Sequence, residues 1–106
     1  PKDLITTKIL VTVFSPKLLE KSIEISSRLR DAPDGASLRS NNINVELYLN
    51  ENDSLEKQLK YADKKGIAYA IIIGPDEASK NLVTLRNMKT REQEILNQKD
   101  LVSKLV

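Results

Sequence analysis

The sequence predicts a three-layer α/β domain in which strands and helices follow one another as β-α-β-α-β-β-β-α. A length of 106 residues is typical of one domain, and a hydrophobic share of 40% is enough for one core. Strand and helix patterns alternate early in the chain, which is typical of parallel strands joined by right-handed crossovers. We therefore interpret residues 1–106 as a single domain. Because the chain begins with Pro1 and its only methionine is Met88, we interpret it as a piece of a longer chain.

The first strand and helix are predicted from residues 8–30. Residues 8–14 form a β-branched apolar run without helical periodicity, which is typical of a buried strand. Ser15 and Pro16 then predict a helix start, because serine is a good N-cap and proline suits the first helical position. Ser22 and Ser26 are small enough to let this helix lie close to a sheet.

A loop and a second strand are predicted next. The sequence Pro33-Asp34-Gly35 breaks the helix, and residues 32–42 are rich in Ser, Asn and Gly, so we expect an exposed loop. Residues 44–50 alternate in polarity, with Val45, Leu47 and Leu49 on one side. This period of two predicts a strand that buries one face.

The second half of the chain predicts a helix, three strands and a final helix. Asp53 with Glu56 three residues later resembles a capping box, and Gly66 suits a left-handed helix stop. Residues 67–73 are apolar on both faces, as in a central strand that ends at Gly74-Pro75. Two short strands are expected at Leu82–Arg86 and Arg91–Ile95, joined by a turn at residues 87–90. A last helix is expected to follow the cap Asn97.

The composition argues against a free-standing enzyme. The chain has neither histidine nor cysteine, which removes the commonest general base, the commonest metal ligand and the usual nucleophile pairs. Glycine-rich phosphate-binding motifs are missing, and the predicted strand ends, at residues 14–15, 50–51 and 74–76, give only weak support to a phospho-accepting receiver. We therefore expect no catalytic, cofactor-binding or metal site in this domain. No apolar run approaches the ~18 residues of a membrane span, and we expect a cytoplasmic protein.

Basic residues gather on the second predicted helix and around the last turn. Lys57, Lys60 and Lys64 share a helix face with Tyr61 beside them, and Arg86, Lys89 and Arg91 surround the turn. Two interpretations stay open: a solvated surface, or contacts to RNA phosphates with a ring that stacks on a base. The net charge of +2 is mild, so any contact with nucleic acid must be local.

The residues themselves then suggest a family. The segment Val45–Glu77, with its K-Q-L-K-Y-A core and the following K-G-I-A-Y-A-I-I-I-G, resembles the C-terminal anticodon-binding domain of histidyl-tRNA synthetases. Val83–Glu94 is similar to the closing strands of that domain. The resemblance implies a mixed five-stranded sheet flanked by three helices, shared with the threonyl-, prolyl- and glycyl-tRNA synthetases (class IIa). The connection at residues 31–42 is longer than is usual in this family, and we expect a surface excursion there.

The resemblance also implies which residues meet the anticodon. The threonyl-type contacts, an asparagine, a glutamate and an arginine, fall on Asn52, Glu77 and Arg86. A glutamate accepts from base N–H groups, an arginine donates in a fork and an asparagine does both. The other interpretation is structural: Asn52 and Glu77 would be turn residues, and Arg86 would be a surface residue of a strand. Further candidates, from their position on the second helix, are Tyr61, Gln58 and Lys60.

The implied function is anticodon recognition for a histidine–tRNA ligase. The partners would be the anticodon stem-loop of tRNA-His and a separate catalytic domain of the parent chain, which would be homodimeric and would use ATP and magnesium. The alternative is a synthetase-like regulatory or dimerisation module of another protein, such as a starvation-sensing kinase. The sequence leaves open whether the parent chain is an active ligase.

Overall fold

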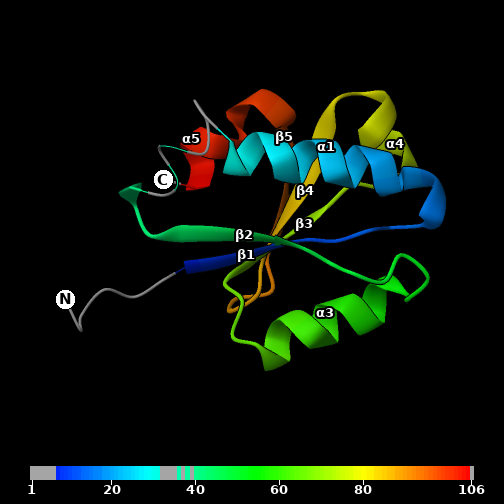
Figure 1. Cartoon of the computed structure of the whole chain (residues 1–106), viewed down its shortest axis with the longest axis horizontal. Coiled ribbons are helices and arrows are strands. Elements are labelled where there is room, and N and C mark those ends of the chain that lie inside the picture. Colours follow the sequence, from blue (N-terminus) through cyan, green and yellow to red (C-terminus); the bar gives the residue numbers. More distant parts are fainter. Residues whose placement is uncertain (1–6, 32–35, 37, 39, 106) are drawn as a thin grey trace.

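A computed structural model describes residues 7–31, 36, 38 and 40–105, and five strands form one mixed sheet in it (Figure 1). The strands lie in the order β2-β1-β3-β4-β5. β1 pairs in parallel with both β2 and β3, whereas β4 is antiparallel to its neighbours β3 and β5. The strands are β1 (Thr7–Val11), β2 (Ile43–Leu47), β3 (Tyr69–Ile72), β4 (Leu82–Asn87) and β5 (Gln93–Asn97). The predicted mixed five-stranded sheet is confirmed.

Helices cover both faces of the sheet, which confirms the three-layer arrangement (Figure 1). One face, called here the α1 face, is covered by α1 (Leu19–Arg30), α4 (Pro75–Ser79) and α5 (Leu101–Leu105). The other, the α3 face, carries α3 (Leu55–Lys64). Short 3-10 turns precede two of them, η1 (Pro16–Leu18) before α1 and η2 (Gln98–Asp100) before α5. The five-residue α4 is absent from the elements expected above.

The core has two parts because successive strand side chains point to opposite faces. On the α1 face, strand residues such as Ile9 and Ile71 pack against Ile25 and Leu29 of α1. On the α3 face the cluster is smaller and contains Leu10, Ala62, Ile67, Ala70 and Met88. The central strands β1 and β3 are therefore buried on both sides, as the apolar run 67–73 predicts.

The helix ends differ in part from the expected caps. Ser15 occupies the N-cap position before η1, with Pro16 behind it, but its side chain makes no capping hydrogen bond. The expected cap at Asp53 is wrong: α3 begins after Ser54, whose hydroxyl accepts from the Lys57 N–H at 3.2 Å. Gly66 has φ +70° after α3, which confirms the left-handed stop.

Two leucines correct the expected loop and strand between α1 and α3. Leu38 is helical and 1% exposed in the α1-face core, so the connection contributes to the core and is not wholly an exposed loop. The expected helix breaker at residues 33–35 lies outside the described residues. Leu49 is 91% exposed because β2 ends at Leu47, and Tyr48 packs instead on the α3 face.

The length and hydropathy of the helices show whether any of them could span a membrane. In the part of the chain that the structure describes, no helix is long and apolar enough to cross a membrane.

Candidate nucleic-acid interface

The α3 face is only partly covered. α3 packs over β1 and β3, through Leu10 and Ala70, while the neighbouring part of β4 and β5 is open. Val83 and Leu85 of β4 point into the α1-face core, so Arg86 points to the α3 face. Its partner in the strand register is Gln93 of β5. This open sheet surface lies beside α3.

A groove of about 420 Å³ separates α3 from the end of β4 and the turn that follows. We call it the α3 groove. Its apolar lining comes from Leu55, Leu59 and Met88, and its charged lining from Lys60, Arg86, Arg91, Glu56 and Asp63. Lys60 forms an exposed i,i+4 ion pair with Glu56 at 3.8 Å, which contributes little to stability and leaves the ammonium accessible. The groove thus combines cations with an apolar base.

Arg86 has unused hydrogen-bonding capacity in this groove. Its Nη1 donates to Gln93 Oε1 at 2.9 Å. Its Nε is buried, and it has no hydrogen-bond partner in the described part of the structure. A buried donor without a partner costs roughly 1–3 kcal/mol. A ligand cannot reach the buried Nε, but the guanidinium lines the α3 groove, and its N–H groups that face the groove can donate to an acceptor there.

A second group of side chains lies at the carboxyl edge of the parallel strands, where β1, β2 and β3 all leave the sheet. Phe14 follows β1, and Gly74 and Glu77 follow β3. Glu77 Oε1 accepts from the Gly74 N–H at 2.8 Å. Gly74 leaves room for this contact, because a Cβ there would lie 2.6 Å from Glu77 Oε1 and 3.8 Å from Phe14 Cδ2. The ring and the carboxylate are therefore neighbours around one glycine.

The three residues implied by the resemblance are not brought into contact. Asn52 lies exposed in the turn after β2, where its N–H donates to Asn50 Oδ1 at 3.0 Å. Arg86 pairs with Ala70, four residues before Gly74, so it lies roughly 13 Å from that glycine along the strand direction. Within the described residues, no hydrogen bond or ion pair joins Asn52, Glu77 and Arg86. A chain of unpaired bases is long enough to meet them one at a time.

Gln58 lies inside the fold. Its side chain is fully buried, and its Nε2 donates to the carbonyls of Val13 at 2.7 Å and Asp53 at 3.0 Å. Its Oε1 accepts from the Val13 N–H at 2.8 Å. The amide is thus occupied by the protein backbone, and this position corrects the expectation that Gln58 contacts RNA.

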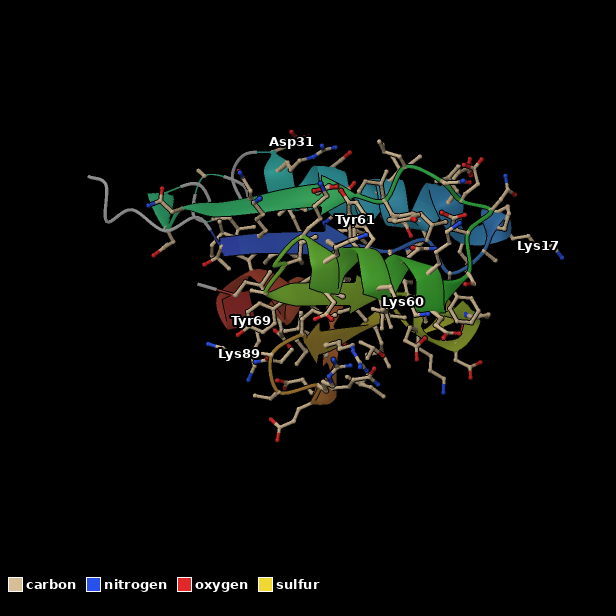
Figure 2. The ribbon with its side chains drawn as sticks, turned by 90° about the horizontal axis from the view of Figure 1, so that it is seen from below. Lys17, Asp31, Lys60, Tyr61, Tyr69 and Lys89 are labelled. Carbon is tan, nitrogen blue, oxygen red and sulfur yellow. The ribbon has the colours of Figure 1, made fainter. Side chains whose placement is uncertain are left out.

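Lys60 and Tyr61 leave α3 on opposite sides (Figure 2). Lys60 lines the α3 groove, whereas Tyr61 points toward β2. Its hydroxyl donates to Glu46, and this hydrogen bond together with burial raises the pKa of Tyr61. The Tyr61 ring meets Tyr48 edge-on at 5.3 Å between centroids, and Lys65 Nζ lies 5.9 Å from its centroid. Tyr61 therefore belongs to a separate surface from Arg86.

Phe14 and Arg91 are site candidates that the sequence interpretation left out. Arg91 was noted only as part of the basic cluster, and Phe14 only as the end of a strand. A signal for Phe14 was available, because ligands of α/β sheets bind beyond the carboxyl ends of the parallel strands. A ring that follows closely on the carboxyl end of such a strand is a candidate for that reason alone.

Comparison with known proteins gives consistent matches. The family model described as "Anticodon binding domain" matches residues 8–106. A histidine–tRNA ligase of Finegoldia magna is 44% identical over 68 residues, which cover 64% of this chain and 16% of the relative. One of Cytophaga hutchinsonii is 35% identical over 92 residues, covering 87% of this chain and 20% of the relative. A threonine–tRNA ligase of Sulfurovum sp. is 42% identical over 55 residues, which cover 52% of this chain and 9% of the relative.

A solved structure supports the same grouping. The crystal structure of histidyl-tRNA synthetase from Nostoc sp. superposes with a TM-score of 0.75 at 26% identity, covering 95% of this chain and 22% of that one. The chain thus spans about a fifth or less of the length of the relatives named here. The model match over residues 8–106, together with these relatives, confirms the resemblance: the chain belongs to the anticodon-binding domain family of the aminoacyl-tRNA synthetases.

Proposed function

We propose that this chain binds the anticodon stem-loop of tRNA-His on behalf of a histidine–tRNA ligase. The family supports a role in anticodon binding, and the histidine–tRNA ligases among the relatives support this choice of tRNA. The observation that carries the proposal is Arg86, whose side chain points to the α3 face of the sheet and lines the α3 groove together with Lys60 and Arg91.

Each part of the surface has a chemical task in this proposal. Sequence-specific RNA recognition targets single-stranded loops, whose splayed bases expose their edges. Arg86 donates to base acceptors in the α3 groove, while Lys60 and Arg91 neutralise phosphates. Glu77 accepts from base N–H groups at the carboxyl edge, and Asn52 either donates or accepts there. Gln58 has no part in the contact, and Tyr61 lies outside the groove.

The proposed contribution of this module is positioning. Binding the stem-loop orients the tRNA so that its acceptor end reaches a separate catalytic domain, which converts binding energy into correct geometry. The catalytic domain, its ATP and magnesium, a homodimeric parent and a cytoplasmic site of action all belong to the proposal.

A titration tests the proposal directly. The 106-residue chain is titrated with an anticodon stem-loop carrying GUG and with the same stem carrying a scrambled loop, at low and physiological salt. We expect tighter binding of the GUG loop at both salts, because base contacts persist when phosphate contacts are screened. Equal affinity for the two loops at both salts would contradict the proposal and favour an interaction or dimerisation module.

Two variants assign the selectivity to Arg86. Arg86→Lys keeps the charge and loses the fork, so we expect the preference for GUG to fall about tenfold, since a base-reading arginine contributes about 1–3 kcal/mol. The matched control is Lys99→Gln, on the far side of the sheet from the α3 groove. It should lower the affinity for both loops slightly and equally.

A further inference from the structure

The only phenylalanine of the chain lies in an unusual place. Phe14 is 42% exposed, although Val11, Thr12 and Val13 before it are fully buried. A single exposed apolar side chain is common on protein surfaces and by itself indicates nothing. The neighbours of Phe14 distinguish it from Ile23, which is exposed by the same 42% on α1.

The Phe14 ring lies beside a carboxylate of fixed orientation. Phe14 Cδ2 and Glu77 Oε1 both lie within 4 Å of the position that a Gly74 Cβ would take. Oε1 is occupied by the Gly74 N–H at 2.8 Å. Oε2 has no hydrogen-bond partner among the residues that the structure describes, and so one oxygen orients the carboxylate while the other can accept.

The backbone that carries the ring is fixed as well. Gln58 bonds both the N–H and the carbonyl of Val13, the residue before Phe14. Thr12 N–H and Oγ1 both donate to the Ile71 carbonyl of β3, at 3.0 and 2.8 Å. A ring attached to such a rigid segment loses little conformational freedom when a ligand covers it, which favours binding.

We infer that Phe14 stacks on one unpaired base of the bound RNA loop while Glu77 Oε2 accepts from the edge of that base. Aromatic side chains bind unpaired bases through their π-faces, and the stacking tolerates any base. The carboxylate adds selectivity, because it accepts and cannot donate. Guanine presents two adjacent N–H donors on its Watson–Crick edge and is the base that fits. This inference rests on the proposed function and adds a base-stacking residue, Phe14, to it.

The absence of tryptophan from the sequence provides a direct probe. Phe14→Trp introduces a single indole at the inferred stacking position, and Ile23→Trp introduces one with a matched exposed fraction on α1. Both are titrated with the GUG stem-loop. We expect saturable quenching of the fluorescence of Phe14→Trp, since a stacked base quenches an indole, and little change in Ile23→Trp.

Affinity measurements complete the test. We expect Phe14→Leu to weaken binding of the GUG loop about tenfold or more and Phe14→Tyr to retain it, since both rings can stack. Glu77→Gln should reduce the preference for GUG over a loop in which adenine replaces each guanine. Circular dichroism confirms that each variant is folded, and Phe14→Tyr keeps the test informative if the leucine variant is unstable.

The outcomes separate this inference from the proposed function. If the unaltered chain prefers GUG, while Phe14→Leu binds as tightly and Phe14→Trp is not quenched, the stacking role is overturned and the proposed function stands. If the unaltered chain does not distinguish the loops, the proposed function fails and the stacking role fails with it.

Discussion

The side-chain amide of Gln58 forms two hydrogen bonds with the backbone of Val13, 45 residues earlier in the chain. β1 ends at Val11, so the N–H and carbonyl of Val13 lie beyond the strand, and Gln58 supplies partners for both. A third bond, to the Asp53 carbonyl, ties the same amide to the segment before α3. Gln58 therefore joins the end of the central strand to α3 and holds the residue next to Phe14.

Gln58→Leu tests this connection. The substitution keeps the approximate side-chain volume and leaves the N–H and carbonyl of Val13 without partners. We expect a loss of about 1–3 kcal/mol in unfolding free energy for each of these buried groups, measured by urea denaturation. Gln93→Leu is the control, because its exposed side chain bonds only Arg86 and the change should stay within about 0.5 kcal/mol. Equal midpoints for the two variants would show that the Gln58 bonds contribute nothing.

Tyr48 makes the stability of the fold sensitive to alkaline pH. The hydrogen bond that Tyr48 donates to Asp53, at 2.6 Å, together with burial, raises the pKa of Tyr48 from 10.0 to about 12. A raised pKa means that folding favours the neutral phenol. This contribution is fully present below pH 10 and is lost as the pH rises from about 10 towards 12.

Tyr48→Phe should therefore be less stable than the unaltered chain at pH 8 and should lose less further stability above pH 10. Urea denaturation at a series of pH values measures both effects. Tyr69→Phe, which removes a phenol outside the Tyr48–Asp53 pair, is the control and should keep the alkaline loss. If the unfolding free energy of Tyr48→Phe fell above pH 10 as steeply as that of the unaltered chain, the alkaline loss of stability would come from other groups.

Gly74→Ala separates recognition from stability. The new methyl group would lie 2.6 Å from Glu77 Oε1, so the carboxylate must move away and lose the Gly74 N–H. The displaced atom ends a flexible side chain, and we expect a stability loss of only about 0.5–1.5 kcal/mol, one hydrogen bond. In stem-loop titrations the preference for GUG should fall.

The matched glycine is Gly66, where φ is +70° and no atom crowds a Cβ. Gly66→Ala should cost about 1 kcal/mol or more through backbone strain and leave the preference for GUG unchanged. A Gly74→Ala chain that still prefers GUG as strongly as the unaltered chain would remove Glu77 from the base-reading set.

Leu38→Ala tests whether the connection between α1 and β2 supports the core. Leu38 is 1% exposed and packs in the α1-face cluster, so we expect a loss of about 2–5 kcal/mol in unfolding free energy. Leu49→Ala is the control, since a side chain that is 91% exposed should change stability by less than about 0.5 kcal/mol. Thermal and urea denaturation measure both variants. Similar stabilities would mean that Leu38 contributes no more than a surface residue.

Local chemistry made much of the fold predictable. The apolar run 67–73 specified a central strand because burial on both faces requires apolar side chains at every position. Gly66 marked the end of α3, since its φ of +70° favours glycine, and Gly74-Pro75 marked the end of β3, since proline has no N–H for the strand ladder. α4 escaped prediction because five residues carry too little periodicity to distinguish a helix from a turn.

The candidate site was only partly accessible from sequence. Arg86 was named from the family resemblance and Lys60 from its position on the second helix, and both line the α3 groove. Gln58 was also named from its helix position but is buried. The sequence pattern missed this, because a polar residue on a helix looks the same whether its side chain contacts water or the backbone. Only the packing of α3 against the end of β1 determines whether the Gln58 side chain contacts water or the backbone.

By itself, then, the sequence determined the strands, most of the helices and their order, because periodicity, caps and turn residues act over a few positions. The tertiary structure decided which polar and aromatic side chains remain available. The Gln58 amide is occupied by the Val13 backbone, Leu38 enters the core, and Phe14 lies next to Gly74, sixty positions later in the chain. These contacts join segments distant in sequence, and each depends on how the strands and helices pack together, which no local pattern encodes.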